Sequence, residues 1–271
     1  MWWGKGMSTK LNRQGLPWKR VWVTGAGRGI GAALARLFCE QGLVVYASSR
    51  TQKDLDFLQK ELEIYPGKII PIPLDICNTE EIDGLVSQWK EENTFPELVV
   101  LNAGTHDPFP AAEFSAERCR KLLDINLMGT INCLDPALKY YLKQDFEKGK
   151  KGQIAVMASV AGYRGLPTAA AYGASKAALI HLCESLWLDL SGSGVKLQVI
   201  NPGFVRTPLT DKNTFTMPDL MEPEDAAKAI LKGLQADRFE IAFPTRFVCV
   251  LKFLRLLPYS VYFWLAKRIT G

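Results

Sequence analysis

The sequence predicts an α/β protein in which helices cover both faces of one parallel, doubly wound sheet. Short apolar runs rich in Val and Ile alternate with longer helical patterns along most of the 271 residues. The runs are apolar at consecutive positions, so both faces of each strand must be buried, as they are in parallel sheets. The first run also leads directly into a glycine-rich turn that opens a helix, the order found in strand–helix–strand units.

The expected elements follow one another in simple alternation. Strands are predicted at residues 20–24, 43–47, 68–74, 98–101, 153–158 and 196–200, and helices at 30–41, from about 52, and near 79–92. We expect a single domain over residues 19–243, after a basic extension at 1–18 and before an apolar, basic helical segment at 244–271. In such sheets ligands bind at the carboxyl ends of the strands, so the loops there are the first place to look for function.

The composition limits the class of protein. With 48% hydrophobic residues, the chain can bury a substantial core. Its six cysteines are scattered, with no close pair, which fits neither a metal site nor a disulfide framework. Such a pattern is typical of reduced thiols, and residues 1–15 lack the apolar stretch of a secretory signal, so we expect a cytoplasmic protein.

The net charge of +5 is unevenly distributed. Residues 1–20 and 241–271 carry five basic residues each and no acid, which leaves 23 basic against 28 acidic residues in between. The body of the protein is therefore acidic on balance, and no nucleic-acid partner is expected.

The end of the chain, residues 246–271, is apolar, aromatic and basic. Its charges and Pro258 interrupt any single membrane span. One interpretation is a lid or interface helix packed on the domain. The other is a segment that lies on anionic lipid at a membrane surface, where the protein would be peripheral.

The first predicted strand ends in the sequence Thr-Gly-Ala-Gly-Arg-Gly-Ile-Gly, residues 24–31. Glycines at this point allow a tight turn and bring backbone N–H groups close to a pyrophosphate at the start of a helix. An ordinary strand-to-helix turn is the alternative, and the generic GxGxxA pattern also fits, through Gly27, Gly29 and Ala32. We prefer the TGxxxGxG spacing, which makes the candidate cofactor-binding residues Gly25, Arg28, Gly29, Ile30 and Gly31.

The end of the second strand predicts which nicotinamide cofactor is bound. A site specific for NAD places an acid there for the ribose hydroxyls. This chain instead has Ser49 and Arg50, with no carboxylate before Asp54. Arg50 offers a planar fork of donors for a 2′-phosphate, and Arg28 adds a second cation. We therefore expect NADP(H), the alternative being that Arg50 is a solvated arginine at a helix start.

The strongest motif is Tyr172-Gly-Ala-Ser-Lys176. Side chains at positions i and i+4 lie on one face of a helix, so the phenol and the ammonium should share the same space. A free tyrosine has a pKa near 10, and a neighbouring cation lowers it, which would make Tyr172 a usable acid/base. The motif follows a strand that ends at Ser159 and precedes another that ends in Asn-Pro-Gly, residues 201–203.

Together these motifs resemble the classical short-chain dehydrogenases/reductases, from about Lys19 to Phe243. The resemblance implies a Rossmann-type fold in which Tyr172 exchanges a proton with the substrate oxygen while a hydride moves to or from the nicotinamide. It also implies that Lys176 lowers the tyrosine pKa and holds the nicotinamide ribose, and that Ser159 hydrogen-bonds the substrate oxygen. Asn126 resembles the family's helix asparagine that anchors a water in a proton relay, the alternative being an asparagine satisfied by neighbouring backbone.

Five further residues match cofactor contacts of the family. Asp75, after the third strand, resembles the residue that contacts the adenine, although it could equally cap a helix. Asn102 belongs to a turn like the family's Asn-Asn-Ala-Gly, with Leu101 in place of the first asparagine. Pro202, Gly203 and Thr207 match the segment that holds the nicotinamide carboxamide. His106 could touch substrate, but we expect it to be a solvent-exposed loop histidine.

The resemblance implies an NADP(H)-dependent oxidoreductase that interconverts a carbonyl and a secondary alcohol. Its partners would be a small carbonyl or alcohol, hydrophobic if the apolar segment 208–222 closes over it, and further copies of the chain in a homodimer or homotetramer. One alternative is a catalytically silent sensor or scaffold of the same fold, which loss of Tyr172, Lys176 or Ser159 would have favoured. Another is an epimerase-type relative, which usually has a different glycine spacing and a larger substrate lobe.

Overall fold

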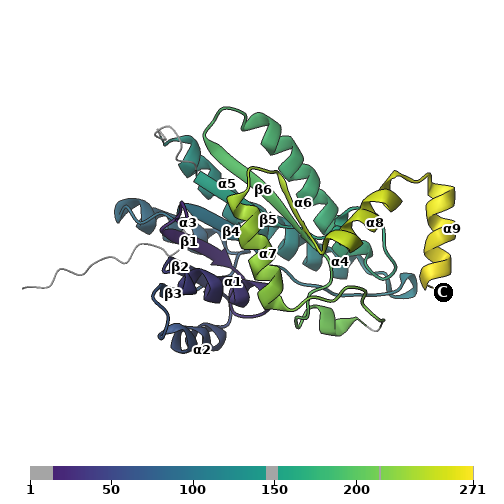
Figure 1. The fold of residues 1–271 in the computed structure, drawn as a ribbon, viewed down its shortest axis with the longest axis horizontal. Coiled ribbons are helices and arrows are strands. Elements are labelled where there is room, and N and C mark those ends of the chain that lie inside the picture. Colours follow the sequence, from purple (N-terminus) through teal and green to yellow (C-terminus); the bar gives the residue numbers. More distant parts are fainter. Residues whose placement is uncertain (1–14, 145–151, 214, 271) are drawn as a thin grey trace, which may run out of the picture.

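The computed structural model describes residues 15–144, 152–213 and 215–270, and within these ranges seven parallel strands form one sheet. The strand order is β3-β2-β1-β4-β5-β6-β7, so the sheet winds outward in both directions from β1 and β4 (Figure 1). The strands are β1 (Arg20–Thr24), β2 (Val44–Ser49), β3 (Lys68–Pro73), β4 (Leu98–Leu101), β5 (Gly152–Met157), β6 (Val195–Pro202) and β7 (Glu240–Phe243).

Helices cover both faces of this sheet, as predicted (Figure 1). One layer buries Leu34, Leu55 and Ile230 against the strands. It contains α1 (Gly29–Glu40), α2 (Gln52–Leu62) and α7 (Pro223–Gln235). The opposite layer contains α3 (Thr79–Glu91), α5 (Gly129–Leu142) and α6 (Ala170–Asp189), with α4 (Ala116–Leu123) packed beside α6. The prediction of a doubly wound Rossmann-type sheet is therefore confirmed.

The predicted strand bounds agree with the structure at β1 and β4 and differ by one or two residues elsewhere. The strand β7 was not predicted. It has four residues at the edge of the sheet, and only Ile241 and Phe243 of these are buried. A strand covered on one face lacks the continuous apolar run by which the central strands were found.

The apolar end of the chain forms two helices, α8 (Thr245–Leu256) and α9 (Tyr259–Thr270), on either side of Pro258. Val248 and Leu251 of α8 are buried in the same hydrophobic cluster as α6 and β6. Among the described residues, no helix is long and apolar enough to cross a bilayer. In Figure 1 the two helices project from one end of the molecule.

The turn between β1 and α1 has room for glycine alone at several positions. Gly25 and Gly29 have φ angles of +65° and +57°, in the left-handed region that favours glycine. A Cβ atom on Gly31 would lie 2.2 Å from the carbonyl oxygen of Gly25 and 2.6 Å from Nδ2 of Asn102. The first turn of α1 can therefore approach the end of β1 only because residue 31 has no side chain.

We predict that Gly31→Ala lowers the free energy of unfolding by about 1–3 kcal/mol, because the new methyl group must displace backbone atoms. The matched control is Gly84→Ala, in the exposed interior of α3, where a Cβ meets no atom within 4 Å. That variant should gain about 0.5–1 kcal/mol from its better helix propensity. Chemical denaturation of both proteins checks the pair, and equal changes would contradict the account of the turn.

Candidate active site

A cavity of about 270 Å³ lies at the carboxyl ends of the central strands. It brings together most of the predicted cofactor-binding and catalytic residues, although Gly31 and Asn126 lie behind its wall. The predicted residues that line it are Gly25, Arg28, Gly29, Ile30, Ser49, Arg50, Asp75, Asn102, Ser159, Tyr172, Lys176, Pro202, Gly203 and Thr207.

One end of the cavity is the glycine-rich turn, which Asn102 ties to β4. The Nδ2 atom of Asn102 donates to the carbonyl oxygens of Thr24 at 2.9 Å and Gly25 at 3.1 Å. The backbone N–H groups of Asn102 and Ala103 donate in turn to the Thr24 hydroxyl. Asn102 therefore shapes the turn from behind. Thr207 closes the turn from the other side, since a Cβ on Gly29 would lie 3.0 Å from its methyl carbon.

The corner beyond the turn contains both cations and carboxylates. Arg28 and Arg50 are exposed at the cavity edge, which Ser49, the last residue of β2, also lines. Asp54 also lines this corner, where a Cβ on Gly27 would lie 2.9 Å from both Asp54 Cβ and Ser49 Oγ. The sequence analysis missed Asp54 as a site residue because it begins a helix rather than ending a strand.

Asp75 lies at the same corner, after β3. Its Oδ1 accepts a hydrogen bond from the Cys77 N–H at 3.0 Å, so it forms a turn of its own. The residue that caps α3 is Asn78, whose side chain accepts from the N–H groups of Glu80 and Glu81. The alternative of a helix-capping role for Asp75 is therefore wrong, and its carboxylate lines the cavity.

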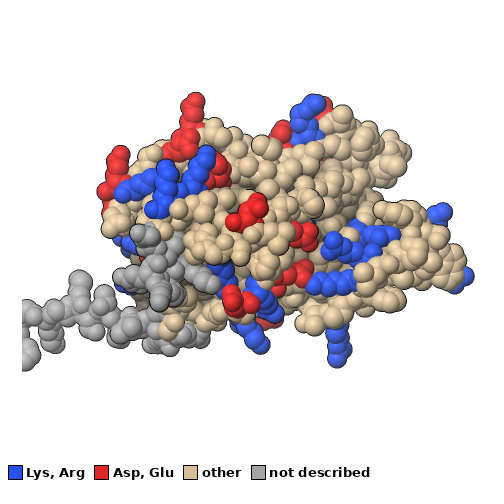
Figure 2. Space-filling view, turned by 90° about the horizontal axis from the view of Figure 1, so that it is seen from above, with Lys and Arg blue, Asp and Glu red and all other residues tan. Residues whose placement is uncertain are grey.

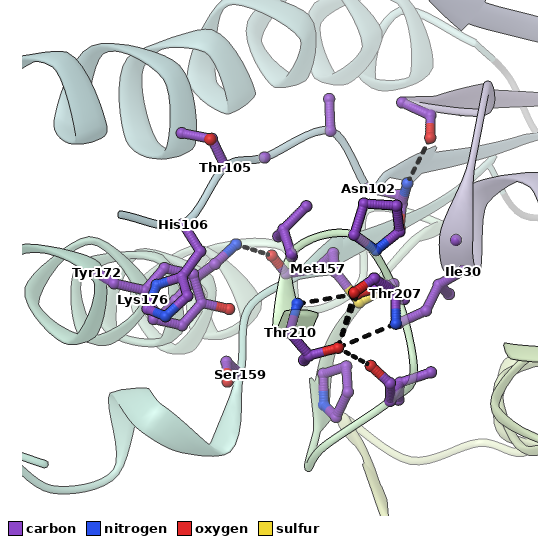
Figure 3. Close-up of a pocket in the computed structure, with 18 of the residues that line it drawn as sticks. Ile30, Asn102, Thr105, His106, Met157, Ser159, Tyr172, Lys176, Thr207 and Thr210 are labelled. Carbon is purple, nitrogen blue, oxygen red and sulfur yellow. Dashed lines mark hydrogen bonds between the residues drawn. The ribbon is translucent and has the colours of Figure 1, made fainter. Parts of the chain in front are cut away.

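The opposite end of the cavity holds the side chains of Tyr172 and Lys176, one turn apart on α6. Figure 3 shows them together with His106, and Ser159 lies close by. Lys176 is buried, and its Nζ donates to the Met157 carbonyl oxygen at 2.9 Å. That bond holds the ammonium 5.7 Å from the centre of the Tyr172 ring. The predicted pairing on one helical face is therefore present as proximity rather than as a direct hydrogen bond.

Burial dominates the titration of both groups. It raises the pKa of Tyr172 above its ordinary value, although hydrogen bonding to Ser159 opposes the rise. Burial also lowers the pKa of Lys176 to about 8. The net rise at Tyr172 comes from desolvation of the phenolate, whereas the Lys176 ammonium bonds to the Met157 carbonyl. A lowering of the Tyr172 pKa by Lys176 stays a prediction.

Asn126 organises the wall behind these residues. It is fully buried in a π-helical turn, η2 (Asp124–Met128), between α4 and α5. Its Oδ1 accepts from the Thr105 N–H at 2.7 Å, and its Nδ2 donates to the Thr105 carbonyl at 3.0 Å and to Ser175 Oγ at 3.2 Å. Ser175 Oγ donates on to the Tyr172 carbonyl oxygen at 2.7 Å. The side chain of Asn126 therefore fixes α6 against the loop after β4, and a water relay at this residue stays a prediction.

His106 is a site residue that the sequence analysis placed wrongly. The expectation of solvent exposure is incorrect, since the side chain is only 9% exposed and lines the cavity. Its ring meets the Tyr172 ring edge-on, with centroids 4.6 Å apart. Nε2 lies 3.2 Å from Asn213 Oδ1, while the buried Nδ1 has no partner among the described residues. Burial lowers the pKa of His106, so the neutral ring is favoured beside the tyrosine.

Aromatic side chains line the mouth of the cavity beyond Tyr172. The ring of Phe204 lies 5.6 Å from that of Phe215 and 5.5 Å from that of Phe247 in α8. Leu166 and Leu209 complete this apolar wall. Leu209 and Phe215 are the members of this wall that belong to segment 208–222, and closure of that segment over a substrate stays a prediction.

We predict that Lys176→Met changes stability in a pH-dependent way. Since the pKa of Lys176 is about 8 in the folded protein against 10.5 ordinarily, the folded state binds fewer protons than the unfolded state between those values. Stability from this group therefore rises with pH in that window. Lys176→Met removes the buried charge and should therefore have a higher free energy of unfolding than the wild type at about pH 7. This difference between the two proteins should shrink by about 2 kcal/mol between about pH 7 and pH 9.5. Urea denaturation at both pH values checks this, and a constant or widening difference would contradict the shift.

Comparisons with known proteins agree with this arrangement. Residues 19–217 match the family model for short chain dehydrogenases. An uncharacterized oxidoreductase of Myxococcus xanthus is 33% identical over 94% of this chain and 98% of its own length. A 3-oxoacyl-[acyl-carrier-protein] reductase of Thermotoga maritima is 30% identical over 80% of this chain and 82% of its own.

Solved structures share the fold. A short chain dehydrogenase from Burkholderia cenocepacia in complex with NADP has a TM-score of 0.76 at 24% identity, over 93% of this chain and 97% of its own. A short-chain dehydrogenase from Sphingobium yanoikuyae in complex with NADPH has a TM-score of 0.75 at 23% identity, over 85% and 91%. The chain belongs to the short-chain dehydrogenase/reductase family of oxidoreductases, which bind a nicotinamide cofactor.

Proposed function

We propose that the protein is an NADP(H)-dependent oxidoreductase that interconverts a carbonyl and a secondary alcohol, with Tyr172 as the general acid/base. The observation that carries this proposal is one continuous cavity. A glycine turn with two arginines forms one end, and Ser159, Tyr172 and Lys176 meet at the other. All three of these residues are present and face one cavity, which favours an enzyme over a silent sensor or scaffold.

The residues at the turn fit a dinucleotide with a 2′-phosphate. The turn from Gly25 to Gly29 offers backbone N–H groups at the start of α1, which suits a pyrophosphate. Arg28 and Arg50 would hold the 2′-phosphate, with Ser49 as a further donor, and Asp75 would contact the adenine. Asp54 is a carboxylate near the same point, so the preference for NADP(H) depends on the two arginines outweighing it. The NADP and NADPH complexes of similar structures support this choice.

The proton chemistry belongs to the chain itself. Bound NADP(H) supplies the hydride for reduction of a carbonyl carbon, or accepts it in the reverse direction. Because burial raises its pKa, Tyr172 is protonated near neutral pH and can donate from Oη to the developing alkoxide oxygen. Ser159 Oγ would hold the same oxygen, and the Lys176 ammonium would stabilise the phenolate that remains. In oxidation the phenolate accepts the proton of the alcohol.

Lys176 and Asn126 have supporting roles in this proposal. Asn126 would hold α6 in place against the loop after β4. The Lys176 Nζ, held by Met157, is close enough to the cavity to bind the nicotinamide ribose hydroxyls as well. Asn102, Pro202, Gly203 and Thr207 would line the nicotinamide end of the cofactor. The reductase activity in the name of the Thermotoga maritima relative supports carbonyl reduction as the reaction class.

Assembly and location complete the proposal. We expect a homodimer or homotetramer, since Leu142 at the end of α5 and Leu188 on α6 are more than half exposed. A cytoplasmic location is supported by the cysteines of the described residues, all of which are free thiols. Residues 246–271 would contact a membrane surface.

The first prediction concerns Tyr172→Phe. Turnover should fall by about a hundredfold to ten-thousandfold, because the variant lacks the proton donor. NADPH affinity should stay within a few-fold, since the hydroxyl serves proton transfer. Steady-state rates with a substrate found by screening, alongside calorimetric titration of NADPH, check both statements. Turnover close to that of the wild type would refute the assigned role.

The second prediction concerns Arg50→Asp. NADPH affinity should fall by about tenfold to more than a hundredfold, the value of one charge-assisted hydrogen bond, while NADH affinity should hold or rise. Lys53→Asp is the matched control. It changes the charge by the same amount at a nearby position on α2, but Lys53 does not line the cavity. It should affect both cofactors little.

A third variant, Asp54→Asn, tests whether the carboxylate of Asp54 or the two arginines determine the cofactor preference. If the carboxylate of Asp54 held the ribose hydroxyls of NAD, Asp54→Asn would weaken NADH and spare NADPH. Equal affinities of the wild type for NADH and NADPH, together with that pattern, would overturn the proposed cofactor preference.

A further inference from the structure

The helices α8 and α9 expose an unusual number of large apolar side chains. Phe253 is 62% exposed, Leu256 81% and Tyr259 70%, although Val248 and Leu251 on the other side of α8 are buried. We call the exposed set the C-terminal apolar surface. It consists of Val250, Phe253, Leu256, Tyr259, Val261, Phe263 and Trp264. Single exposed apolar residues are ordinary, but seven of them on two consecutive helices, with the rings of Tyr259 and Phe263 stacked 5.7 Å apart, indicate a binding surface.

The charged residues of α8 and α9 are all basic, and Lys252 among them pairs with Glu240 of β7. No acidic residue occurs between residues 241 and 271, whereas Arg246, Arg255, Lys267 and Arg268 are exposed there. Figure 2 shows basic and no acidic side chains on the projecting end of the molecule. The guanidinium of Arg268 lies 4.2 Å from the centre of the Trp264 ring. Aromatic rings beside basic groups are the composition of helices that lie at a membrane–water interface.

The surface is held rigidly to the domain by Arg164. Its guanidinium donates to the carbonyl oxygens of Arg255 at 3.0 Å and Leu257 at 3.1 Å, at the end of α8. The same group lies 4.5 Å from the Tyr259 ring centre and 4.6 Å from that of Tyr262. The hydroxyl of Tyr262 donates to the Gly165 carbonyl. A loose tail would not need such a clamp, so the orientation of the surface relative to the domain is fixed.

This fixed position is beside the mouth of the cavity. Leu166, Pro167 and Thr168 follow the Arg164 clamp directly in sequence and line the cavity. On α8, Phe247 lines the cavity too, so one side of this helix faces the site while the other side is exposed. Whatever binds the C-terminal apolar surface is therefore within reach of the substrate entrance.

We propose that the C-terminal apolar surface docks the protein on anionic membrane lipid and that the substrate is a lipid-soluble carbonyl or alcohol that enters from the bilayer. Charge complementarity favours this occupant over a second copy of the chain. Two such surfaces facing each other would bring like charges together, without an acid from either segment to neutralise them. Each 12-residue helix is too short to span a bilayer but long enough to lie in the headgroup region. The docking part stands alone, whereas the substrate part rests on the proposed function.

The docking part is tested by sedimentation with vesicles. The full-length protein should bind vesicles of phosphatidylcholine with phosphatidylserine at least tenfold more tightly than vesicles of phosphatidylcholine alone. High salt should weaken binding to the anionic vesicles, because part of the attraction is screened. No binding to anionic vesicles at low salt would overturn the proposal.

Variants locate the contact. Replacing Phe253, Phe263 and Trp264 together by Ser should weaken anionic-vesicle binding at least tenfold, without changing thermal unfolding appreciably, since all three are exposed. Phe57 and Ile64 are the matched control, because they are 71% and 82% exposed but belong to α2 and the loop that follows it. Their replacement by Ser should leave binding unchanged. Equal effects of both sets, or no effect of the first, would contradict the assignment.

Two further measurements separate the alternatives. Vesicles with brominated acyl chains should quench tryptophan fluorescence less in Trp264→Phe than in the wild type, because a ring at the interface contacts bromine. If the triple variant instead turns an oligomer into a monomer in the absence of lipid, and the wild type ignores vesicles, the surface is an interface between copies.

The proposed substrate class is tested by separate rate measurements. With a long-chain ketone dissolved in anionic vesicles, the triple variant should turn over at least fivefold more slowly than the wild type, while a short water-soluble ketone should give equal rates. Vesicle binding without turnover of either ketone would refute the proposed function but leave the docking intact. Equal rates of both proteins with the vesicle-dissolved ketone would overturn the substrate class.

Discussion

The arrangement of the site depends on the buried amide of Asn126. This one side chain satisfies both backbone groups of Thr105 and reaches Ser175, which in turn bonds the backbone of Tyr172. It therefore joins the loop after β4 to α6, the helix that carries the proposed acid/base. The same loop begins at Asn102, which holds the glycine turn. These hydrogen bonds, joined by the backbone of residues 102–105, thus connect the proposed phosphate site with the backbone of the proposed proton donor. Such buried polar groups are costly unless every partner is present, so the two ends of the cavity are fixed together.

Most of the fold could be predicted from local pattern. The buried strands β1 and β4 are continuous apolar runs. The turn after β1 is recognisable by its glycines, since position 31 has no room for a Cβ atom. The pairing of Tyr172 with Lys176 follows from helical spacing, and resemblance to a family supplied Ser159 and Asn126. These features are readable because each depends on residues close together in the sequence or at the end of a strand.

The rest depends on tertiary contacts that no local pattern contains. His106 is buried because Asn213 and Lys212, more than a hundred residues away, lie over it. The net rise in the pKa of Tyr172 could not be predicted, because helical spacing reveals the proximity of Lys176 but not the desolvation of the phenol. Of the two interpretations of the chain end, packing on the domain holds for part of α8, whereas contact with lipid stays a proposal. One side of α8 packs on the domain, whereas its other side and much of α9 are exposed. Arg164, which makes this arrangement rigid, has no sequence signal that would connect it with α9.

The most direct test of the central claim is transfer of deuterium from NADPH that carries deuterium at both C4 positions of the nicotinamide ring. The protein would be incubated with this cofactor and a panel of short and lipid-soluble aldehydes and ketones, and the products analysed by mass spectrometry. The account predicts an alcohol with one deuterium on the former carbonyl carbon, formed by the wild type and nearly absent with Tyr172→Phe. Tight binding of NADPH without label in any product, or equal labelling by the two proteins, would contradict it.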